Sequence, residues 1–267
     1  MTNRTKKQHC RSQRSFAVFL LAGRFFFVRK EGGNLVKEQT VFVHIWPILW
    51  GDSIRENQIW WYDWLSEAEK SKAERFSCEA DRRRYILSHG YCRSILSRYV
   101  HQRPDKIQFA EEKNQKPIIK TDPHLSIHFN LSHSSHVAVV AVSNRPIGVD
   151  IEWLDSTLVR KELVDQFMSE QEKEVFFRLS SSRQKKAFYY CWTRKEAYVK
   201  ALGEGLFYPI KKITVPLNDE TNLTWSDEEQ PHEPKRWRMD HIGEISGYVG
   251  AVVHQGKNVV CKPILKV

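Results

Sequence analysis

The stretch from Trp192 to Leu206 constrains the fold most, because its pattern predicts a helix that ends at Gly203. One broad face of this helix would carry an aromatic ring, a carboxylate and two ammonium groups, from Trp192, Lys195, Glu196, Val199 and Lys200. A helix that only packs would show aliphatic residues there, and a helix that is only solvated would lack the tryptophan. The alternative is a surface ion pair, since Glu196 precedes Lys200 by four residues.

The segment Gly148–Trp153 is a predicted strand whose two acidic residues, Asp150 and Glu152, lie on one face. The aliphatic residues that alternate with them point to the opposite, buried face. Two neighbouring carboxylates repel each other unless a cation or a proton joins them. Oxygen ligands at this density favour Mg²⁺, and Glu196 could complete the set from the helix. A solvent-facing acidic strand end is the alternative interpretation.

Two further polar segments are candidates for binding phosphate. Residues 129–134 form a strand end that enters a turn, where hydroxyls, amides and the His133 imidazole could seat a phosphate group. Ser-His-Ser also occurs in ordinary turns, so this segment alone is a weak signal. Arg82–Arg84 lie on a predicted helix over about 80–100, where they indicate either a phosphate clamp or a solvated basic turn.

The order of predicted elements indicates an α+β protein with mostly antiparallel sheets. Capping boxes at Ser66–Glu69 and Ser169–Glu172 predict two helix starts. Strand patterns alternate with the helices and cover 41–49, 107–110, 118–120, 127–131, 137–142, 148–153, 213–216, 223–225, 237–241, 247–253 and 259–261. Helices and strands thus recur in two similar halves that meet near Pro146, although no sequence repeat accompanies the likeness.

The formal net charge of +10 is concentrated at the front of the chain. Residues 1–40 hold nine Lys or Arg and two Glu, a net charge of +7, which leaves +3 for residues 41–267. The folded part is therefore only mildly basic, and the charge is weak evidence for nucleic-acid binding. We expect residues 1–40 to be a poorly ordered basic extension, because they show no periodicity that a core could use.

One hypothesis for this extension is that it is translated upstream sequence. Lys30–Asn34 can be encoded by a purine-rich run that resembles a bacterial ribosome-binding site, which would place a non-AUG start at Leu35 or Val36. A genuine leader peptide and an artificial addition are the alternatives.

The cysteines are scattered and none forms a Cys-x-x-Cys pair; they are Cys10, Cys78, Cys92, Cys191 and Cys261. This pattern favours reduced thiols in a cytoplasmic protein over a disulfide framework or a zinc site. His133 and His136 lack a third ligand nearby and do not indicate a metal centre. No segment is long and apolar enough to span a bilayer, since the hydrophobic run Phe16–Val28 is broken by Arg24.

Three motifs, taken in this order, resemble the 4′-phosphopantetheinyl transferase superfamily. They are Asn-Leu-Ser-His-Ser at 130–134, Ile-Gly-Val-Asp-Ile-Glu at 147–152, and Trp-x-x-Lys-Glu-Ala-x-x-Lys at 192–200. The length and the intact Asp-x-Glu resemble the two-lobed, Sfp-type branch, and the likeness spans roughly residues 41–260. Val41–Leu49 and the arginine-rich helix further resemble cyanobacterial members linked to heterocyst glycolipid synthesis. The resemblance implies a pseudo-twofold pair of α+β lobes, which we assign to residues 41–145 and 146–267.

The resemblance also implies a reaction. Members of the family move the phosphopantetheine arm of coenzyme A onto a serine of an apo acyl or peptidyl carrier protein and release 3′,5′-ADP. By position, Asp150, Glu152 and Glu196 would hold Mg²⁺ against the pyrophosphate. Glu196 would also act as the base for the carrier serine, and Lys200 would steady or protonate the departing phosphate.

The same resemblance implies the residues that grip coenzyme A, which are Arg84, Lys116, Asn130, Ser132, His133 and Lys195. Lys116 is followed by Pro117, as the family pattern has it. Arg83 is the alternative to Arg84, since the local match can slip by one residue. The carrier would dock on residues 154–168, through the apolar Val159, Leu163 and Phe167 and the basic Arg160 and Lys161.

We therefore expect a monomeric, cytoplasmic, Mg²⁺-dependent transferase that uses coenzyme A and a carrier protein, but neither nucleic acid nor a membrane. One rival is a catalytically silent module that binds coenzyme A or the carrier, although the intact carboxylate set argues against it. A second rival, a nucleic-acid-binding protein, rests on the basic charge alone. The sequence leaves open whether the carrier serves fatty-acid, polyketide, glycolipid or peptide synthesis, and whether acyl-coenzyme A is accepted.

Overall fold

The computed structural model describes residues 41–49, 58–111, 116–120, 125–219, 224–242, 245–256 and 259–263. Contacts group residues 39–266 into one unit, which contains every described residue. The predicted basic extension at 1–40 lies outside the described residues, so its lack of order stays a prediction.

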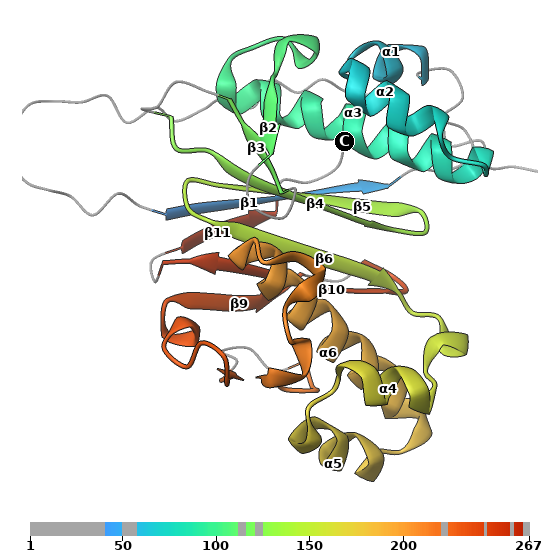
Figure 1. The fold of residues 1–267 in the computed structure, drawn as a ribbon, viewed down its shortest axis with the longest axis vertical. Helices are drawn as coiled ribbons and strands as arrows, with labels where there is room; N and C mark the ends of the chain where they lie inside the picture. Colours follow the sequence, from blue (N-terminus) through green and yellow to red (C-terminus); the bar gives the residue numbers. More distant parts are fainter. Residues whose placement is uncertain are drawn as a thin grey trace, which may run out of the picture. The chain divides into compact units, whose positions relative to one another are not determined.

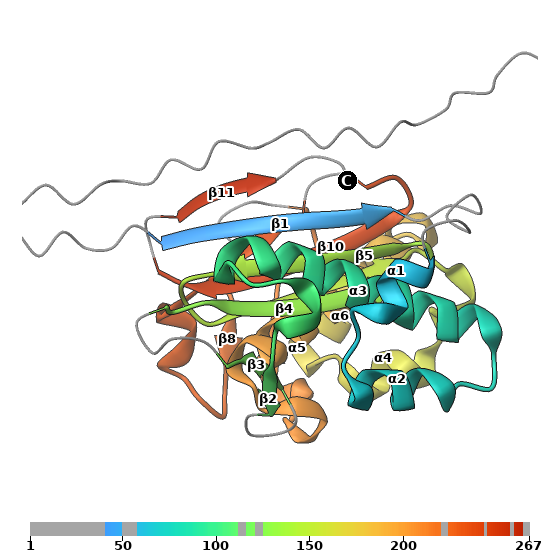
Figure 2. The same cartoon turned by 90° about the horizontal axis from the view of Figure 1, so that it is seen from above.

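The first sheet has the strand order β11-β1-β5-β4 and is covered on one face by a long helix. Its strands are β1 (Val41–Leu49), β4 (His128–Ser134), β5 (Val137–Ser143) and β11 (Val259–Pro263). The helix is α3 (Glu79–Val100), which lies across the sheet in Figure 1 and Figure 2. Trp46 of β1 and Val140 of β5 share an apolar core with Leu96 of α3, and this core seats the helix.

The second sheet has the antiparallel order β6-β10-β9 and packs against a second long helix (Figure 1). Its strands are β6 (Ile147–Trp153), β10 (Tyr248–Gln255) and β9 (Trp237–His241), and the helix is α6 (Ser181–Leu202). Ala251 of β10 shares a core with Tyr198 of α6. Gly203 ends the helix in the left-handed conformation with a φ of 75°, which confirms the predicted stop.

Shorter elements surround these two sheets. The helices are α1 (Gln58–Asp63), α2 (Glu67–Glu74), α4 (Lys161–Phe167) and α5 (Glu170–Arg178), with 3₁₀ turns at Pro104–Lys106, Ser156–Leu158, Gly205–Phe207, Ile210–Lys212 and Glu233–Lys235. Two small hairpin pairs join β2 (Phe109–Glu111) to β3 (Pro117–Ile119) and β7 (Ile213–Thr214) to β8 (Ser226–Asp227). Among the described helices, none combines the length and apolar character that crossing a bilayer requires.

The two sheets face each other through an apolar layer made of alternate strand residues. This layer contains Val43 and Ile45 of β1, Val137, Val139 and Ala141 of β5, Ile147, Val149 and Ile151 of β6, and Val252 of β10. Because side chains alternate along a strand, the other face of each sheet is left for its long helix. The resulting order of layers (helix, sheet, sheet, helix) is visible in Figure 1 and confirms the predicted α+β class with mostly antiparallel sheets.

Strand β11 links the two predicted lobes, residues 41–145 and 146–267, whose boundary stays a prediction. It comes from the second half of the sequence, yet it pairs with β1 in parallel, with Val43 opposite Cys261. The pairing satisfies backbone groups of β1 that would otherwise form a free sheet edge. A parallel partner more than two hundred residues away leaves no local signal, so the sequence pattern could not place it.

Both predicted capping boxes are present, at Ser66–Glu69 and Ser169–Glu172. In each box the glutamate also reaches a buried cation on the following long helix. Glu69 accepts a hydrogen bond of 2.8 Å from Nε of Arg93 in α3, and Glu172 accepts one of 2.6 Å from Nζ of Lys195 in α6. The same arrangement of cap, short helix and buried cation therefore occurs once in each half of the chain.

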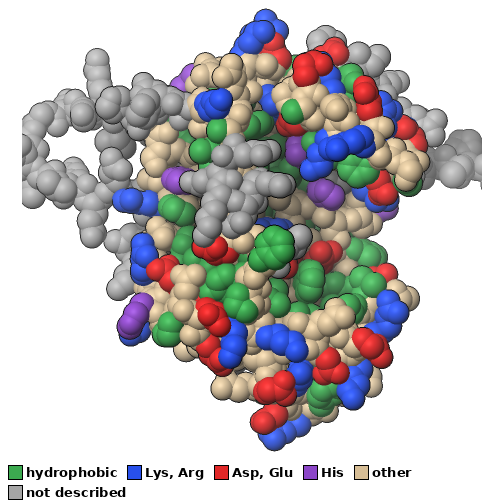
Figure 3. Space-filling view, viewed as in Figure 1, with side chains coloured by type: hydrophobic (Ala, Val, Ile, Leu, Met, Phe, Trp, Pro, Cys, Tyr) green, Lys and Arg blue, Asp and Glu red, His purple; other side chains and the backbone are tan. Residues whose placement is uncertain are grey.

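The surface of the described part carries both signs of charge. On the face drawn in Figure 3, Lys and Arg side chains are interspersed with Asp and Glu rather than gathered into one basic patch. This distribution matches the mild net charge of +3 expected for residues 41–267.

Replacing Glu69 with Gln should lower the free energy of unfolding by about 3 kcal/mol near pH 7. Although burial disfavours the carboxylate, hydrogen bonds from His89 and Arg93 and the Arg93 charge lower the pKa of Glu69 from 4.5 to about 2. A lowered pKa contributes stability above the unfolded value, and that stability is lost as the pH falls through the folded value. The difference between wild type and Glu69→Gln should therefore shrink between about pH 4.5 and pH 2.

Urea unfolding at pH 7 and at pH 3 measures this difference. Glu67→Gln is the matched control on the same helix, because the Glu67 side chain is 91% exposed in its ion pair with Lys70. Equal effects of the two substitutions, or a Glu69→Gln effect that does not change with pH, would contradict the assignment.

Candidate functional site

A pocket of about 240 Å³ lies where β4, β6 and α6 meet. It is lined by Leu131, Ser132, His133, Asp150, Glu152, Trp192, Glu196 and Lys200. All three predicted metal ligands, both predicted catalytic residues and two of the predicted coenzyme A contacts thus line one cavity.

The close approach of α6 to β6 explains why these side chains meet. A Cβ placed on Gly148 would collide with the carbonyl oxygen of Ala197 and the backbone nitrogen of Ala201. Only glycine lets the helix backbone come this near to the strand. The residues at two and four positions further along β6, Asp150 and Glu152, then face the same helix, as the strand alternation predicted.

Asp150 is the central acidic group of the pocket and is 3% exposed. Its Oδ1 accepts hydrogen bonds of 2.9 Å from the Ser132 hydroxyl and 2.5 Å from Nζ of Lys200. Its Oδ2 is buried and has no hydrogen-bond partner among the described residues. A buried carboxylate oxygen without a partner is costly unless a cation or a donor reaches it, so Oδ2 marks a point where the pocket can bind one.

The other two carboxylates resist ionisation more than free carboxylates do. Burial and the charge of Asp150 raise the pKa of Glu152, although hydrogen bonds from Ser134 and Trp192 and the Lys200 charge act in the opposite direction. Burial and the Asp150 charge likewise raise the pKa of Glu196, against the effect of Lys200. Both groups would gain from a cation placed between them.

Lys200 supplies the positive charge within the pocket. Partial burial disfavours its ammonium form, but the nearby charges of Asp150, Glu196 and Glu152 raise its pKa above the usual value for lysine. The side chain therefore stays protonated at neutral pH. Three carboxylates and one ammonium leave the pocket with an excess of negative charge.

The chemistry of the pocket fits a hard divalent cation, but its present geometry does not gather the ligands. Asp150, Glu152 and Glu196 offer only oxygen, the donor that Mg²⁺ prefers. Within the described ranges, however, no three acidic, histidine or cysteine side chains lie close enough together to hold a metal ion. The three-carboxylate centre therefore remains a prediction supported by the donor set and by the free oxygen of Asp150.

His133 lines the pocket, and the positive charge of Arg84 acts on its ring. The His133 ring is exposed, yet desolvation by the surrounding atoms and the positive charges of His89, Lys200 and Arg84 lower its pKa. Arg84 lies on α3, where it is half-buried and forms an ion pair of 2.6 Å with Asp81. Arg83, whose Nε is buried without a hydrogen-bond partner among the described residues, stays the alternative to Arg84 as the arginine that contacts coenzyme A.

Lys195 does not face the pocket, and its predicted contact with coenzyme A is wrong. Its side chain is completely buried, and Nζ donates hydrogen bonds of 2.6 Å to Glu172 and 2.8 Å to the carbonyl oxygen of Phe167. The residues of α6 are spaced by about 100°, so a helix buried on two sides directs neighbouring lysine and glutamate side chains to different environments. Helical spacing alone could not separate these two buried sides.

Two other predicted contacts hold the architecture of the site in place. Nζ of Lys116 donates to the carbonyl oxygens of Ile147, Lys200 and Ala201, at 3.2, 2.6 and 3.4 Å. It therefore caps the end of α6 and ties it to β6. Oδ1 of Asn130 accepts a hydrogen bond of 2.8 Å from the backbone of Val149. A role of either residue in binding a nucleotide stays a prediction.

One residue of the predicted docking segment is also placed differently. Phe167 is 3% exposed and packs edge-to-face on Phe188 and Trp192, at 5.1 Å in both cases, so it is not a surface contact. Arg160 and Lys161 are exposed and Val159 and Leu163 are partly buried. The exposed apolar side chains of this region are instead Trp153 and Leu158.

Sequence reasoning did not assign Ser134 and Trp192 to the site. The Ser134 hydroxyl donates a hydrogen bond of 2.7 Å to Glu152, and the Trp192 ring lines the pocket. The signal for Ser134 was available, because residues 130, 132 and 134 share one face of a strand. Trp192 was recognised as unusual on its helix, but its partner could not be identified without the fold.

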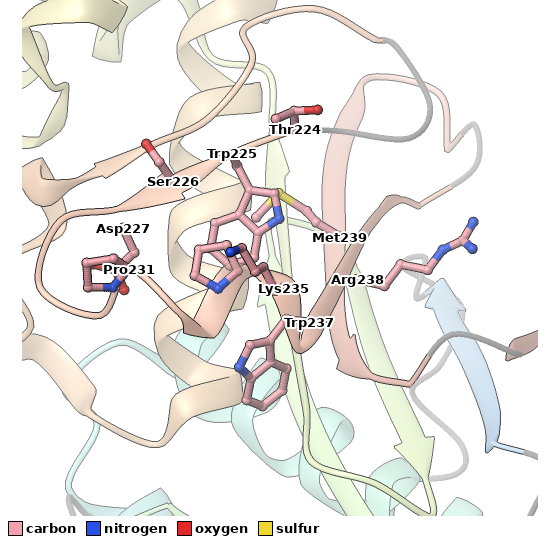
Figure 4. A pocket seen from close by; sticks show the side chains of 10 residues that line it. Thr224, Trp225, Ser226, Asp227, Pro231, Lys235, Trp237, Arg238 and Met239 are labelled. Atoms are coloured by element: carbon pink, nitrogen blue, oxygen red, sulfur yellow. The ribbon is translucent and has the colours of Figure 1, made fainter. Parts of the chain in front are cut away.

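A larger cavity of about 490 Å³ lies elsewhere in the second half of the chain (Figure 4). Its lining includes the apolar residues Trp225, Trp237, Met239, Pro231 and Pro234 and the basic residues Lys235 and Arg238. Asp227 is its acidic group, and this carboxylate already accepts hydrogen bonds from the hydroxyls of Tyr198 and Tyr208. The cavity therefore lacks the convergent charged groups of the smaller pocket.

The fold and the pocket together define a two-sheet α+β protein with an acidic site that can bind a cation and that includes a histidine. Two family models match consecutive parts of this chain. One, described as 4′-phosphopantetheinyl transferase superfamily, matches residues 146–253. The other, described as 4′-phosphopantetheinyl transferase, N-terminal, matches residues 50–145.

Curated relatives carry the same family name. The 4′-phosphopantetheinyl transferase HetI of Nostoc sp. is 38% identical over 144 residues, which are 53% of this chain and 61% of that protein. The transferase psf-1 of Bacillus pumilus is 31% identical over 178 residues, which are 66% and 75% of the two chains. The transferase Sfp of Bacillus subtilis is 29% identical over 178 residues, which are 66% and 78%.

This chain belongs to the 4′-phosphopantetheinyl transferase superfamily and is of the Sfp type, as its three motifs predicted. The family is in general metal-dependent, which agrees with the oxygen-rich donor set of the pocket.

Replacing Gly148 with Ala should destabilise the fold and open the site. The added Cβ meets two backbone atoms of α6, and neither can move aside as a flexible side chain would. We expect a loss of about 3 kcal/mol in urea unfolding and a loss of the contact between Lys200 and Asp150. A variant with wild-type stability would show that α6 is not seated on β6 as described.

Proposed function

We propose that this protein transfers the 4′-phosphopantetheine arm of coenzyme A to a serine of an apo acyl or peptidyl carrier protein and releases 3′,5′-ADP. The observation that carries the proposal is the pocket in which Asp150, Glu152, Glu196 and Lys200 meet in a member of this family. Mg²⁺ is the proposed metal, since all the candidate ligands are oxygens. Bound there, it would offset charge on the transferring phosphoryl group.

Glu196 is the proposed base for the carrier serine. Its raised pKa brings the carboxylate closer to neutral pH, where a base exchanges protons most effectively. The serine proton passes to Glu196 as the serine oxygen bonds to the phosphorus that bears pantetheine. The bond from this phosphorus to the 3′,5′-ADP oxygen breaks. Lys200 stays protonated and can neutralise or protonate that departing oxygen.

Arg84 and His133 are the proposed contacts for the nucleotide phosphates of coenzyme A. His133 lines the pocket, and Arg84 presents a guanidinium whose fork matches a phosphate group. Ser132, which lines the pocket, and Lys116 are proposed as further contacts, although their hydrogen bonds are to protein groups. Asn130 is proposed only to hold β4 against β6 beside the pocket, through its hydrogen bond to the Val149 backbone.

The carrier protein is proposed to dock beside α4, over residues 154–168. Arg160 and Lys161 are exposed there and would attract an acidic carrier helix, while Leu158 offers exposed apolar surface. A monomer acting in the cytoplasm is the simplest setting for this reaction. The thiols of Cys78, Cys92 and Cys191, which are free, suit such a reducing compartment.

Neither nucleic acid nor a membrane is a proposed partner. The mixed charges on the face in Figure 3 do not resemble a nucleic-acid footprint. The identity of the carrier, any link to heterocyst glycolipids and the use of acyl-coenzyme A are addressed by a panel of apo carriers from fatty-acid, polyketide, glycolipid and peptide synthesis, each offered coenzyme A or acyl-coenzyme A.

Incubation of the protein with an apo carrier, coenzyme A and Mg²⁺ tests the proposal. Mass spectrometry should detect one added phosphopantetheine group on the carrier serine. Glu196→Gln should nearly abolish the gain while the protein keeps its melting temperature, because the base and one proposed metal ligand are lost but the side-chain volume is kept.

The rival interpretation is a catalytically silent module that binds coenzyme A or the carrier. Binding of coenzyme A without any mass gain, across the whole carrier panel, would favour the rival. Wild-type rates in Glu196→Gln would remove this residue from the mechanism but leave the transfer intact.

Replacing Arg84 with Ala should raise the coenzyme A concentration needed for half-maximal rate by about tenfold or more, with a smaller effect on the maximal rate. A charge-assisted contact to the nucleotide contributes mainly to binding if it is made to the 3′-phosphate, since that phosphate takes no part in the bond changes. Arg82→Ala is the matched control, because Arg82 pairs with Glu79 on the same turn. Equal effects of the two variants on steady-state kinetics would contradict the clamp.

A further inference from the structure

Three side chains of β4 bind the backbone of β6 in strict alternation. Asn130, Ser132 and Ser134 accept hydrogen bonds from the backbone nitrogens of Val149, Ile151 and Trp153, at 2.8, 3.3 and 3.0 Å. Each pair is separated by nineteen residues. Among the described strands, β4 pairs through its backbone with β5, and β6 with β10. These side chains therefore connect the two sheets at β4 and β6, two described strands that are not paired with each other by backbone hydrogen bonds.

We call Asn130, Ser132 and Ser134, with the β6 backbone groups that they bind, the seam between β4 and β6. The two serines of the seam also donate hydrogen bonds to carboxylates. The Ser132 hydroxyl donates to Oδ1 of Asp150 at 2.9 Å, and the Ser134 hydroxyl donates to Oε2 of Glu152 at 2.7 Å. A hydroxyl can accept one hydrogen bond and donate another, so each serine links a backbone N–H of β6 to a carboxylate of the same strand. The Asn130 oxygen only accepts, and it has no such carboxylate.

We propose that Ser134 is a positioning residue that aims the Glu152 carboxylate at the metal ion. The proposal rests on the metal-dependent function proposed above and adds a residue that this function does not itself assign. A ligating carboxylate is oriented by the groups that hydrogen-bond its other oxygen. Ser132 acts in the same way on Asp150, but that carboxylate also has the Lys200 ammonium. Glu152 is instead held by neutral donors, the Ser134 hydroxyl and the Trp192 ring, and of these two Ser134 also binds the backbone of β6.

The position of the Ser134 hydroxyl is itself well defined. Ser134 ends β4 and opens the turn into β5, in which Ser135 has a positive φ of 49°. The next residue, His136, donates its backbone N–H to the Tyr248 hydroxyl at 3.0 Å. The Tyr248 ring packs edge-to-face on Trp153 at 5.0 Å. The turn is thus held to β6 by the Ser134 hydroxyl and to β10 by the His136 backbone.

A titration with Mn²⁺, a paramagnetic substitute for Mg²⁺, tests the proposal on the full chain. Electron paramagnetic resonance reports free Mn²⁺ directly, so the affinity is read without any turnover. Coenzyme A is held at a saturating concentration, verified for each variant. Ser134→Ala should weaken Mn²⁺ binding by about tenfold or more, and Ser134→Thr, which keeps the hydroxyl, should restore most of the affinity.

Asn130→Ala is the matched control within the same seam. It removes one bond between β4 and β6, as Ser134→Ala does, but it releases no carboxylate. We expect both alanine variants to lose a similar amount of stability in urea, while only Ser134→Ala loses metal affinity.

Three outcomes would overturn the proposal. Wild-type Mn²⁺ affinity in Ser134→Ala would show that Glu152 needs no such support. An equal loss in Asn130→Ala would show that the seam matters only for joining the sheets. No Mn²⁺ binding by the wild-type protein would remove the metal site itself; carrier modification without added metal would then show that the transfer holds and that its metal dependence failed, whereas no modification at all would show that the proposed function failed too.

Discussion

The seating of α6 on β6 at Gly148 is the contact on which the site depends. Because nothing larger than hydrogen fits there, the helix backbone lies directly against the strand, and side chains one turn away must share a narrow space. Glu196 and Lys200 on the helix thereby meet Asp150 and the next acidic residue on the strand. Desolvation in that space raises the pKa of the glutamates and strengthens every charge interaction among the group.

Two repeated devices hold this arrangement against the mutual repulsion of its carboxylates. The first is the buried ion pair between a capping-box glutamate and a cation on the long helix, with Glu69 and Arg93 in one half and Glu172 and Lys195 in the other. It anchors each long helix to a short one. The second is the seam of side chains between β4 and β6, which joins the sheets and supports the carboxylates at once. Both devices use polar groups that are paired where they are buried.

The parts of the site that follow local rules could be predicted from sequence. Strand alternation put Asp150 and Glu152 on one face, and capping boxes and a terminal glycine marked the helix limits. The predictions that failed concern residues on helices that pack against other elements on more than one side. Lys195 was expected in the pocket because it neighbours Glu196, but it turns into the core to meet Glu172. Phe167 was expected at the surface, but it packs on the ring of Trp192.

The sequence by itself determined the residue chemistry: which carboxylates, hydroxyls and cations exist, at what spacing, and to which family they belong. Periodicity is local, so it defined individual helices and strands and their polar faces. Only the tertiary structure decided which faces meet. The pairing of β11 with β1, the seam from Ser134 to Glu152 and the inward turn of Lys195 all join segments distant in sequence. Such contacts depend on the packing of whole layers, and no local pattern carries that information.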